Sequence, residues 1–175
     1  LVCDEFFQDR TLLEILDDYF RKNKRAAGIG VNWLLFGSSG SVEYPAGGVL
    51  DSFRYCARDE FERNRLVKSL VIPEKIIGWV DSHLPTAIMG YYMANADGEK
   101  IKLPRIELSE DKGIRLYHYY VKNKKHFVEK VNKGFADRIA HEDMDMFEYC
   151  DRNDIYNEKA MKLKAYLSGK SQNIV

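Results

Sequence analysis

The run at residues 26–36, AAGIGVNWLLF, constrains the fold more than any other part of the sequence. The apolar residues Ile29, Val31 and Trp33 alternate with smaller residues, and this period of two predicts a β-strand. The sequence GSSG at 37–40 follows directly and ends the strand, because glycine and serine favour turns. A strand this apolar must be covered by other elements, so the chain has to build its core around it.

Hydrophobic periodicity along the chain predicts an α/β fold with a mixed central sheet flanked by helices and a helical C-terminal tail. Strands are expected at residues 1–7, 26–36, 67–72, 76–80, 87–93 and 114–121. Helices are expected at residues 11–22, 123–133 and most of 142–167; the start of 49–65 favours a helix, and 95–98 reads as a turn. We interpret residues 1–167 as one domain and 168–175 as a frayed tail.

Composition excludes several classes of protein. The chain carries 27 Lys and Arg against 27 Asp and Glu, so it has no net field that would attract nucleic acid. No window approaches the roughly 18 uninterrupted apolar residues of a membrane-spanning helix. Cys3, Cys56 and Cys150 are odd in number and far apart, which disfavours a disulfide framework or a zinc site and leads us to expect reduced thiols in the cytoplasm.

Acidic and histidine residues provide the first candidates for chemistry. Asp4 and Glu5 follow an apolar run, and adjacent carboxylates can supply oxygen ligands to a divalent ion, although they also fit a solvated strand end. His118 lies in a predicted strand as either a functional or a core residue. His83, two residues after Asp81, fits a loop at a site and a polar turn equally well.

The glycine-serine loop and the aromatic residues before it are the second candidate. A phosphate-binding P-loop is excluded, because Gly40 is followed by Ser-Val-Glu rather than by Lys-Ser or Lys-Thr. Trp33 and Phe36 could form an aromatic platform for a sugar ring, or they could simply belong to the core. The sequence contains no Gly-x-Ser-x-Gly elbow and no Cys-His nucleophile pattern.

Several segments form an ordered series along the chain: CDEFF, NWLLFGSSG, GVLDSFRYCAR, VKSLVIP, SHLP, IRLYHYYVKNKKHFVEKVNKG and FEYCDRNDIYNEKA. This series resembles the family-2-like and family-92 glycosyltransferases of the GT-A fold, whose members carry an Asp-x-Asp-Glu-Phe strand end, a Trp-x-x-Phe-Gly-Ser-Ser-Gly loop and a Val-Lys-Ser strand. The resemblance covers nearly the whole chain. It implies transfer of a hexose from a nucleotide sugar to a glycan or lipid-linked acceptor in surface polysaccharide biosynthesis.

The resemblance also implies roles for individual residues. Asp4 would bind a divalent metal, usually manganese, that neutralises the diphosphate leaving group, and His118 would be a further metal or donor ligand. Lys68 and His83 would contact the donor. The acceptor side would comprise Trp33, Phe36, Gly37, Ser38 and Ser39. The base that deprotonates the acceptor hydroxyl stays open among Glu43, Asp51 and Asp81.

The chain departs from the family pattern in places. Val2 stands where the family has its first Asp, which removes one carboxylate from the metal site. Asn123 and His126 replace a family Ser and Glu near the start of the predicted helix 123–133. The nucleotide-binding half would precede Asp4, so we expect an acceptor-side part that binds nucleotide sugar weakly alone and associates with itself through its exposed first strand.

Two other interpretations compete with a glycosyltransferase. The first is a non-catalytic binding or interaction module derived from one, which the replacement at Val2 and the expected absence of the donor half favour. The second is a metal-dependent hydrolase that would use Asp4, Glu5, His83 and His118, although the sequence has no tight His-x-His or Asp-x-His cluster for a two-metal site.

Overall fold

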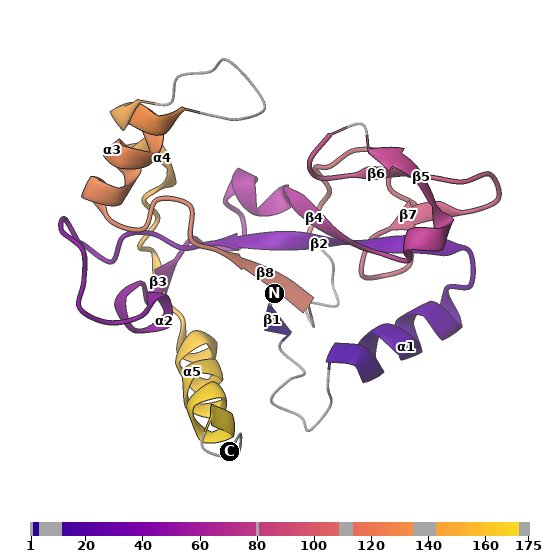
Figure 1. Cartoon of the computed structure of the whole chain (residues 1–175), viewed down its shortest axis with the longest axis horizontal. Helices are drawn as coiled ribbons and strands as arrows, with labels where there is room; N and C mark the ends of the chain where they lie inside the picture. The colour runs from indigo at the N-terminus through magenta and orange to yellow at the C-terminus, as the bar shows by residue number, and fades with distance from the viewer. Residues whose placement is uncertain (1, 4–11, 80, 109–113, 135–142, 172–175) are drawn as a thin grey trace. The chain divides into compact units, whose positions relative to one another are not determined.

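The structure is a computed structural model, and it describes residues 2–3, 12–79, 81–108, 114–134 and 143–171 (Figure 1). It confirms the predicted mixed α/β class, with a mixed sheet and several helices. Within the described ranges, no helix is long and apolar enough to cross a membrane.

The chain divides into two compact units that no linker in the sequence marks. Unit 1 contains Leu1–Leu34 and Asp59–Tyr117, and unit 2 contains Leu35–Arg58 and His118–Val175. The chain therefore passes from one unit to the other directly after Leu34, Arg58 and Tyr117.

Unit 1 is built on a mixed sheet around β2, Ala26–Leu35 (Figure 1). The described strands follow the order β1 (Val2–Cys3), β8 (Ile114–His118), β2 and β4 (Val67–Val71), and β7 (Tyr92–Ala94) also pairs with β2. β4 runs antiparallel to β2, and β7 runs parallel to it. The strands expected at 26–36, 67–72 and 114–121 are thus present with slightly shorter bounds.

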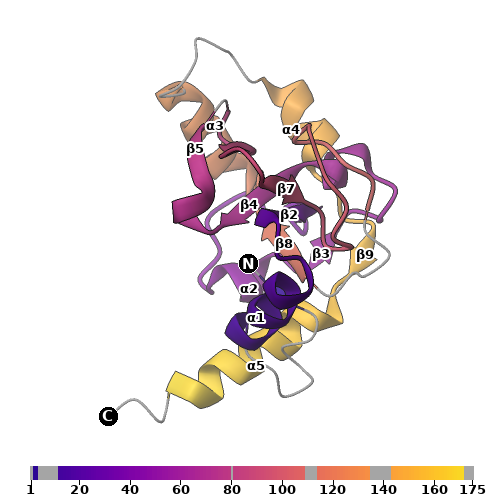
Figure 2. The same cartoon turned by 90° about the vertical axis from the view of Figure 1, so that its right-hand side faces the viewer.

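Every residue of β2 is buried, because both faces of the strand are covered. On one face lies helix α1, Leu12–Lys22 (Figure 2). Its Ile15 packs in one buried cluster with Ile29 and Val31. On the other face, Gly28 and Gly30 lie against Met93 and Ile101, since a Cβ added to these glycines would lie 2.7 Å and 2.6 Å from the two side chains, respectively. The alternation in the sequence thus separates two buried faces rather than a buried face and an exposed one.

The prediction that residues 87–93 form a single strand is wrong. A hairpin of β5 (Ile76–Trp79) and β6 (Pro85–Ala87) precedes it, and β7 starts only at Tyr92. Gly90 lies between β6 and β7 with a φ of 91°, a left-handed conformation that breaks the extended backbone. The turn expected at 95–98 is confirmed by the hydrogen bond from the Gly98 N–H to the Asn95 carbonyl.

Unit 2 is mainly helical. Helix α3, Lys124–Lys133, confirms the predicted helix: the Asn123 side chain accepts the His126 N–H at its start, and Gly134 follows its end. α3 packs beside α4, Met144–Cys150, through Phe127 and Phe147, whose ring centroids lie 5.3 Å apart (Figure 1). Between α4 and α5 (Glu158–Ser171) lies β9, Ile155–Tyr156, and β9 pairs with β3, Tyr55–Cys56.

The helix favoured at the start of 49–65 is limited to α2, Val49–Ser52. It ends because the N–H groups of Arg54 and Tyr55 turn to the hydroxyl of Ser39, which accepts a hydrogen bond from each. The charged residues that follow form no continuous helix; Glu62–Arg65 is a 3₁₀ turn, η2. α5 extends to Ser171, into the segment 168–175 that was expected to be a frayed tail.

Candidate functional site

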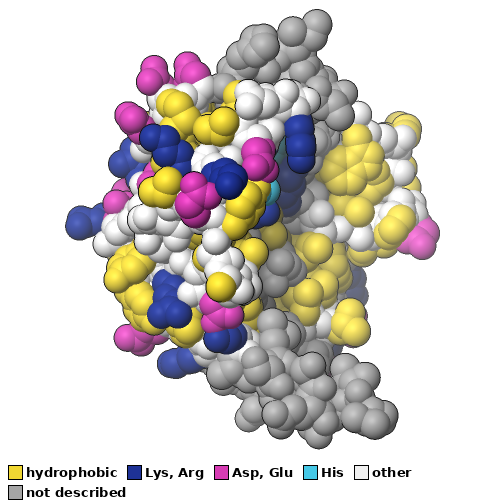
Figure 3. Space-filling model, turned by 60° about the vertical axis from the view of Figure 1, so that its left-hand side comes forward, with side chains coloured by type: hydrophobic (Ala, Val, Ile, Leu, Met, Phe, Trp, Pro, Cys, Tyr) yellow, Lys and Arg dark blue, Asp and Glu magenta, His cyan; other side chains and the backbone are white. Residues whose placement is uncertain are grey.

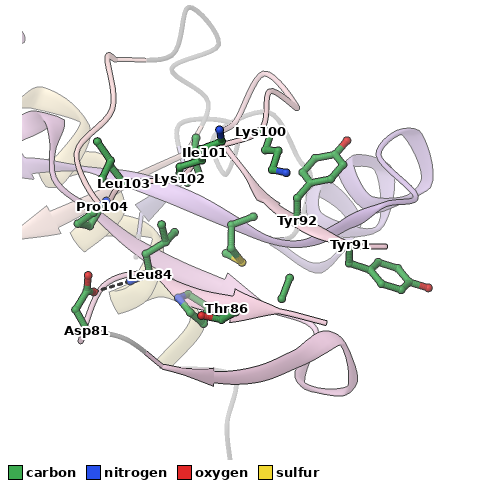
Figure 4. A pocket seen from close by; sticks show the side chains of 13 residues that line it. Asp81, Leu84, Thr86, Tyr91, Tyr92, Lys100, Ile101, Lys102, Leu103 and Pro104 are labelled. Carbon is green, nitrogen blue, oxygen red and sulfur yellow. Dashed lines mark hydrogen bonds between the residues drawn. The ribbon is translucent and has the colours of Figure 1, made fainter. Parts of the chain in front are cut away.

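A short loop after β5 carries two of the predicted site residues, Asp81 and His83. The Asp81 carboxylate closes the loop, because its Oδ1 accepts the backbone N–H groups of His83 and Leu84, the latter at 2.8 Å (Figure 4). Pro85 then starts β6. The Asp-Ser-His-Leu-Pro sequence therefore forms a turn that fixes the positions of the aspartate and the histidine.

Two side chains of strand β4 anchor this loop through hydrogen bonds. The Lys68 Nζ donates to the Ser82 carbonyl at 2.6 Å, and the Ser69 hydroxyl donates to the His83 carbonyl at 2.7 Å. Lys68, which the family resemblance assigns to the donor side, thus lies beside Asp81 and His83 in unit 1. Three residues selected separately from the sequence belong to one local network.

The environment of His83 selects one tautomer of its ring. Its Nδ1 lies 2.8 Å from the carbonyl oxygen of Val67. A carbonyl only accepts hydrogen bonds, so the proton of the neutral ring is on Nδ1 and Nε2 keeps a lone pair. Among the described residues nothing hydrogen-bonds to Nε2. His83 can therefore accept a proton or a hydrogen bond from a ligand at that nitrogen.

Trp33 supports His83 rather than offering a platform for a ligand. It lies in β2 with 5% of its surface exposed, and its ring centroid is 5.4 Å from that of His83 at an interplanar angle of 43°. The buried Arg115 donates to the Trp33 carbonyl and also contacts Asp59 at 3.1 Å. This arrangement fixes the backbone behind the histidine ring.

Asp81 and Leu84 line one end of a pocket with a volume of about 430 Å³ (Figure 4). Leu84, Met93 and Ile101 form a buried cluster beneath it. Tyr91, Tyr92 and Lys100 line the pocket away from Asp81 (Figure 4). The sequence analysis missed these three residues, although the adjacent tyrosines before a turn were a visible signal.

The carboxylate of Asp81 is able to act as a base at this pocket. Its Oδ1 is occupied by backbone N–H groups, whereas its Oδ2 receives no hydrogen bond from the described residues. The side chain is exposed at the pocket, so a ligand hydroxyl can reach the carboxylate.

The other two candidate bases, in unit 2, already have cationic partners. Glu43 pairs with Lys125 at 3.0 Å, and 71% of the Glu43 side chain is exposed. Asp51 pairs with Lys164 of α5, and the hydrogen bond from this lysine lowers the pKa of the Asp51 carboxyl. Figure 3 shows that basic and acidic side chains also lie interspersed on the face that it draws. A lysine partner makes a carboxylate a weaker base, so we favour Asp81.

The glycine-serine loop in unit 2 is bound to the segment after α4. The buried Ser38 donates its N–H and its hydroxyl to the Asp151 carboxylate, the hydroxyl at 2.9 Å. The Ser39 N–H donates to the Asn153 side chain at 2.7 Å. A side chain at Gly37 would collide with the Arg152 carbonyl, since a Cβ would lie 2.4 Å from its oxygen. The loop consists of small residues because the segment after α4 packs directly against it.

The remaining predicted site residues are placed as follows. Phe36 is fully buried, with its ring centroid 4.6 Å from that of Tyr119. His118 ends β8 half-buried, and its ring centroid lies 5.7 Å from that of Tyr120. Asp4 and Glu5 lie outside the described residues.

A metal site is not assembled within the described part of the chain. No group of three or more His, Cys, Asp or Glu side chains there could hold a metal ion. The two residues predicted to bind metal were His118 and Asp4, and Asp4 is outside the described ranges. The residues that the structure describes therefore do not by themselves fit the implied manganese ion.

The candidate site that the described residues support best is thus the pocket of unit 1 with the Asp81–Leu84 loop at its edge. The pocket combines an exposed carboxylate with a buried apolar floor. His83 belongs to the same loop as Asp81 and has a defined tautomer, although it is not one of the residues that line the pocket. Comparisons of the chain with protein-family models, with curated proteins and with solved structures found no match.

Proposed function

We propose that the protein is a GT-A-type glycosyltransferase that moves a hexose from a nucleotide sugar to a glycan or lipid-linked acceptor in surface polysaccharide assembly. One observation carries the proposal beyond the sequence resemblance. Asp81, His83 and Lys68, which that resemblance linked to the reaction, lie together in one network, and Asp81 lines a pocket of about 430 Å³. This volume is within the range of small-molecule sites, roughly 300 to 1,000 Å³.

Asp81 is the proposed base. In a direct displacement its Oδ2 takes the proton of the acceptor hydroxyl, and the hydroxyl oxygen forms a bond to the anomeric carbon of the donor. The bond from that carbon to the diphosphate oxygen breaks, and the diphosphate leaves with the electron pair. The backbone N–H groups on Oδ1 hold the carboxylate in place throughout.

His83 and Lys68 are the proposed donor contacts. The Nε2 lone pair of His83 accepts a hydrogen bond from a hydroxyl of the nucleotide sugar, because Nδ1 carries the proton toward Val67. The ammonium of Lys68 uses one donor on Ser82 and keeps two for diphosphate oxygens. Both roles place the donor next to the proposed base.

The proposal includes a divalent metal, which takes no part in the proton transfer and bond changes assigned to Asp81. Asp4 would bind it, and bound manganese would supply charge neutralisation at the leaving diphosphate. We therefore expect turnover to fall on treatment with a chelator and to return on addition of Mn²⁺.

An Asp81→Asn variant tests the assignment of the base. Asparagine keeps an oxygen acceptor for the two loop N–H groups, but it takes up no proton, so kcat should fall by about 10²- to 10⁴-fold with little change in folding. Transfer is measured on the protein at its full natural length, with a panel of UDP-sugars, Mn²⁺ and glycan acceptors. Asp97→Asn, a change at another exposed turn aspartate of unit 1, is the matched control.

The outcomes separate the interpretations. Loss of transfer in Asp81→Asn alone supports the proposal. Equal rates in wild type and Asp81→Asn would remove Asp81 as base and return the choice to Glu43 and Asp51. Binding of glycans without transfer from any nucleotide sugar would instead support the non-catalytic module.

A further inference from the structure

The pocket of unit 1 has chemically different ends. Asp81 lies at one end, whereas Tyr91, Tyr92 and Lys100 lie at the other (Figure 4). Its floor is apolar and closely packed: Leu84, Met93 and Ile101 are each at most 9% exposed. A ligand in this pocket would therefore be oriented along its length.

The tyrosine end is surrounded by cations. The Lys75 Nζ lies 4.5 Å from the centroid of the Tyr91 ring, and Arg25 and Lys100 each lie 6.0 Å from that of Tyr92. Figure 4 shows the Lys100 side chain directed toward the Tyr92 ring. Of these three cations, Lys100 lines the pocket itself, whereas Arg25 and Lys75 contact the rings of the two tyrosines that line it.

Within the described residues, the hydrogen-bond partners of Arg25 and Lys75 are carbonyl groups rather than acids. The Arg25 Nε donates to the Gly90 carbonyl, and the Lys75 Nζ donates to the Lys24 and Ala26 carbonyls. Lys100 forms no ion pair with an acid in the part of the chain that the structure describes, and the same holds for Arg25 and Lys75. Carbonyl partners fix the positions of Arg25 and Lys75 but leave their charge available to a ligand.

A neighbouring cavity limits where an anion can bind. Lys100 also lines a second cavity of about 600 Å³, whose other residues include Asp97, Glu99 and Glu107. These three acids repel an anion. A negatively charged ligand near Lys100 is therefore favoured in the first pocket, where Asp81, the one acid among the described lining residues, lies at the far end.

We propose that this pocket binds a sugar that carries an anionic group, with the sugar ring against the tyrosines, the anion near Lys100 and a hydroxyl directed toward Asp81. The anion can be a carboxylate, as in a uronate, or a phosphate. This inference rests on the proposed function, because it identifies the bound sugar as the acceptor. It selects acidic acceptors over neutral ones.

Direct binding tests the inference without any transfer step. Glucuronate, glucose 6-phosphate and glucose are titrated into the full chain in the absence of nucleotide sugar, and binding is followed by calorimetry and by NMR. At least one of the two anionic sugars should bind at least tenfold more tightly than glucose, and added salt should weaken its binding. The stronger of the two identifies the source of the negative charge.

Charge variants assign the contact. Lys100→Glu should weaken binding of the anionic sugar at least tenfold, whereas Lys100→Arg should retain it. Lys124→Glu, at an exposed lysine on α3, is the control for a general change in charge. Circular dichroism confirms that each variant is folded.

The inference is overturned if glucose binds as tightly as both anionic sugars, if none of the three sugars binds, or if Lys100→Glu and Lys124→Glu have equal effects. Its failure is distinct from failure of the proposed function. Transfer to a neutral acceptor that Lys100→Glu leaves unchanged would contradict the acidic-sugar site but not the transferase. Binding of the acidic sugar with no transfer from any donor would contradict the transferase alone.

Discussion

Two loops rich in small and polar residues use their polar groups in opposite ways. In the Asp81–Leu84 loop of unit 1, the aspartate folds the turn with one oxygen, and the other oxygen and the Nε2 of His83 accept nothing from the described residues. In the loop of unit 2 that contains Ser38 and Ser39, the hydroxyls and N–H groups bind neighbouring protein groups. Polar groups without a protein partner can bind a ligand and therefore indicate a site, whereas polar groups that bind other protein groups have a structural role.

The largest expected difference between the loops is in stability. Asp151→Ala removes the carboxylate that accepts both donors of the buried Ser38, and it should lower the free energy of unfolding by about 2–3 kcal/mol, since buried donors would be left without partners. Asp81→Ala should cost only about 0.5–1 kcal/mol, because water can reach the exposed turn. Urea unfolding measures both.

Glu148→Ala, at an exposed position on α4 near Asp151, is the control and should have almost no effect. Equal losses for Asp151→Ala and Asp81→Ala would contradict the distinction between a structural loop and a site loop. A shift of the denaturant midpoint with an unchanged m-value would show that stability alone has changed.

The second prediction concerns the ring of His83. Its neutral form should carry the proton on Nδ1, because the Val67 carbonyl lies 2.8 Å away, whereas histidines free in water favour the Nε2 form. Nitrogen NMR of the labelled protein distinguishes the two tautomers. His83→Ala should also cost about 1 kcal/mol, through loss of the contact with Trp33. An Nε2-protonated ring would remove the acceptor assigned to the donor hydroxyl.

Much of the fold was predictable from local patterns. The period of two in β2 and the capping residue Asn123 of α3 are local signals, and both elements formed as predicted. The predictions failed where contacts between residues far apart in the sequence determine the local structure. Ser39 captures the N–H groups that a longer α2 would need, and the two covered faces of β2 depend on packing against α1 and on the cluster around Met93.

The site was predictable in part and for the same reason. Asp81 and His83 are neighbours in sequence, so one short loop brings them together. The roles of Ser38 and Trp33 required contacts across many residues: Asp151 lies far along the chain from Ser38, and His83 covers the Trp33 ring. A small hydroxyl-bearing loop looks the same in sequence whether a ligand or the protein itself approaches it.

The smallest expected effect tests the carboxylate in unit 2 that has a lysine partner. The hydrogen bond from Lys164 lowers the pKa of Asp51 below its ordinary value, so the pair stabilises the folded state above the pKa of an unfolded aspartate, about 3.9. The stabilisation is lost as the pH falls through the lower, folded pKa. A double-mutant cycle of Asp51→Asn and Lys164→Ala should therefore show a coupling at pH 7 that declines as the pH is lowered through the folded pKa of Asp51 and that weakens in high salt. A coupling that changes with neither pH nor salt would mean that the two side chains interact by packing rather than by charge, and Asp51 would then be a stronger rival to Asp81 as the base.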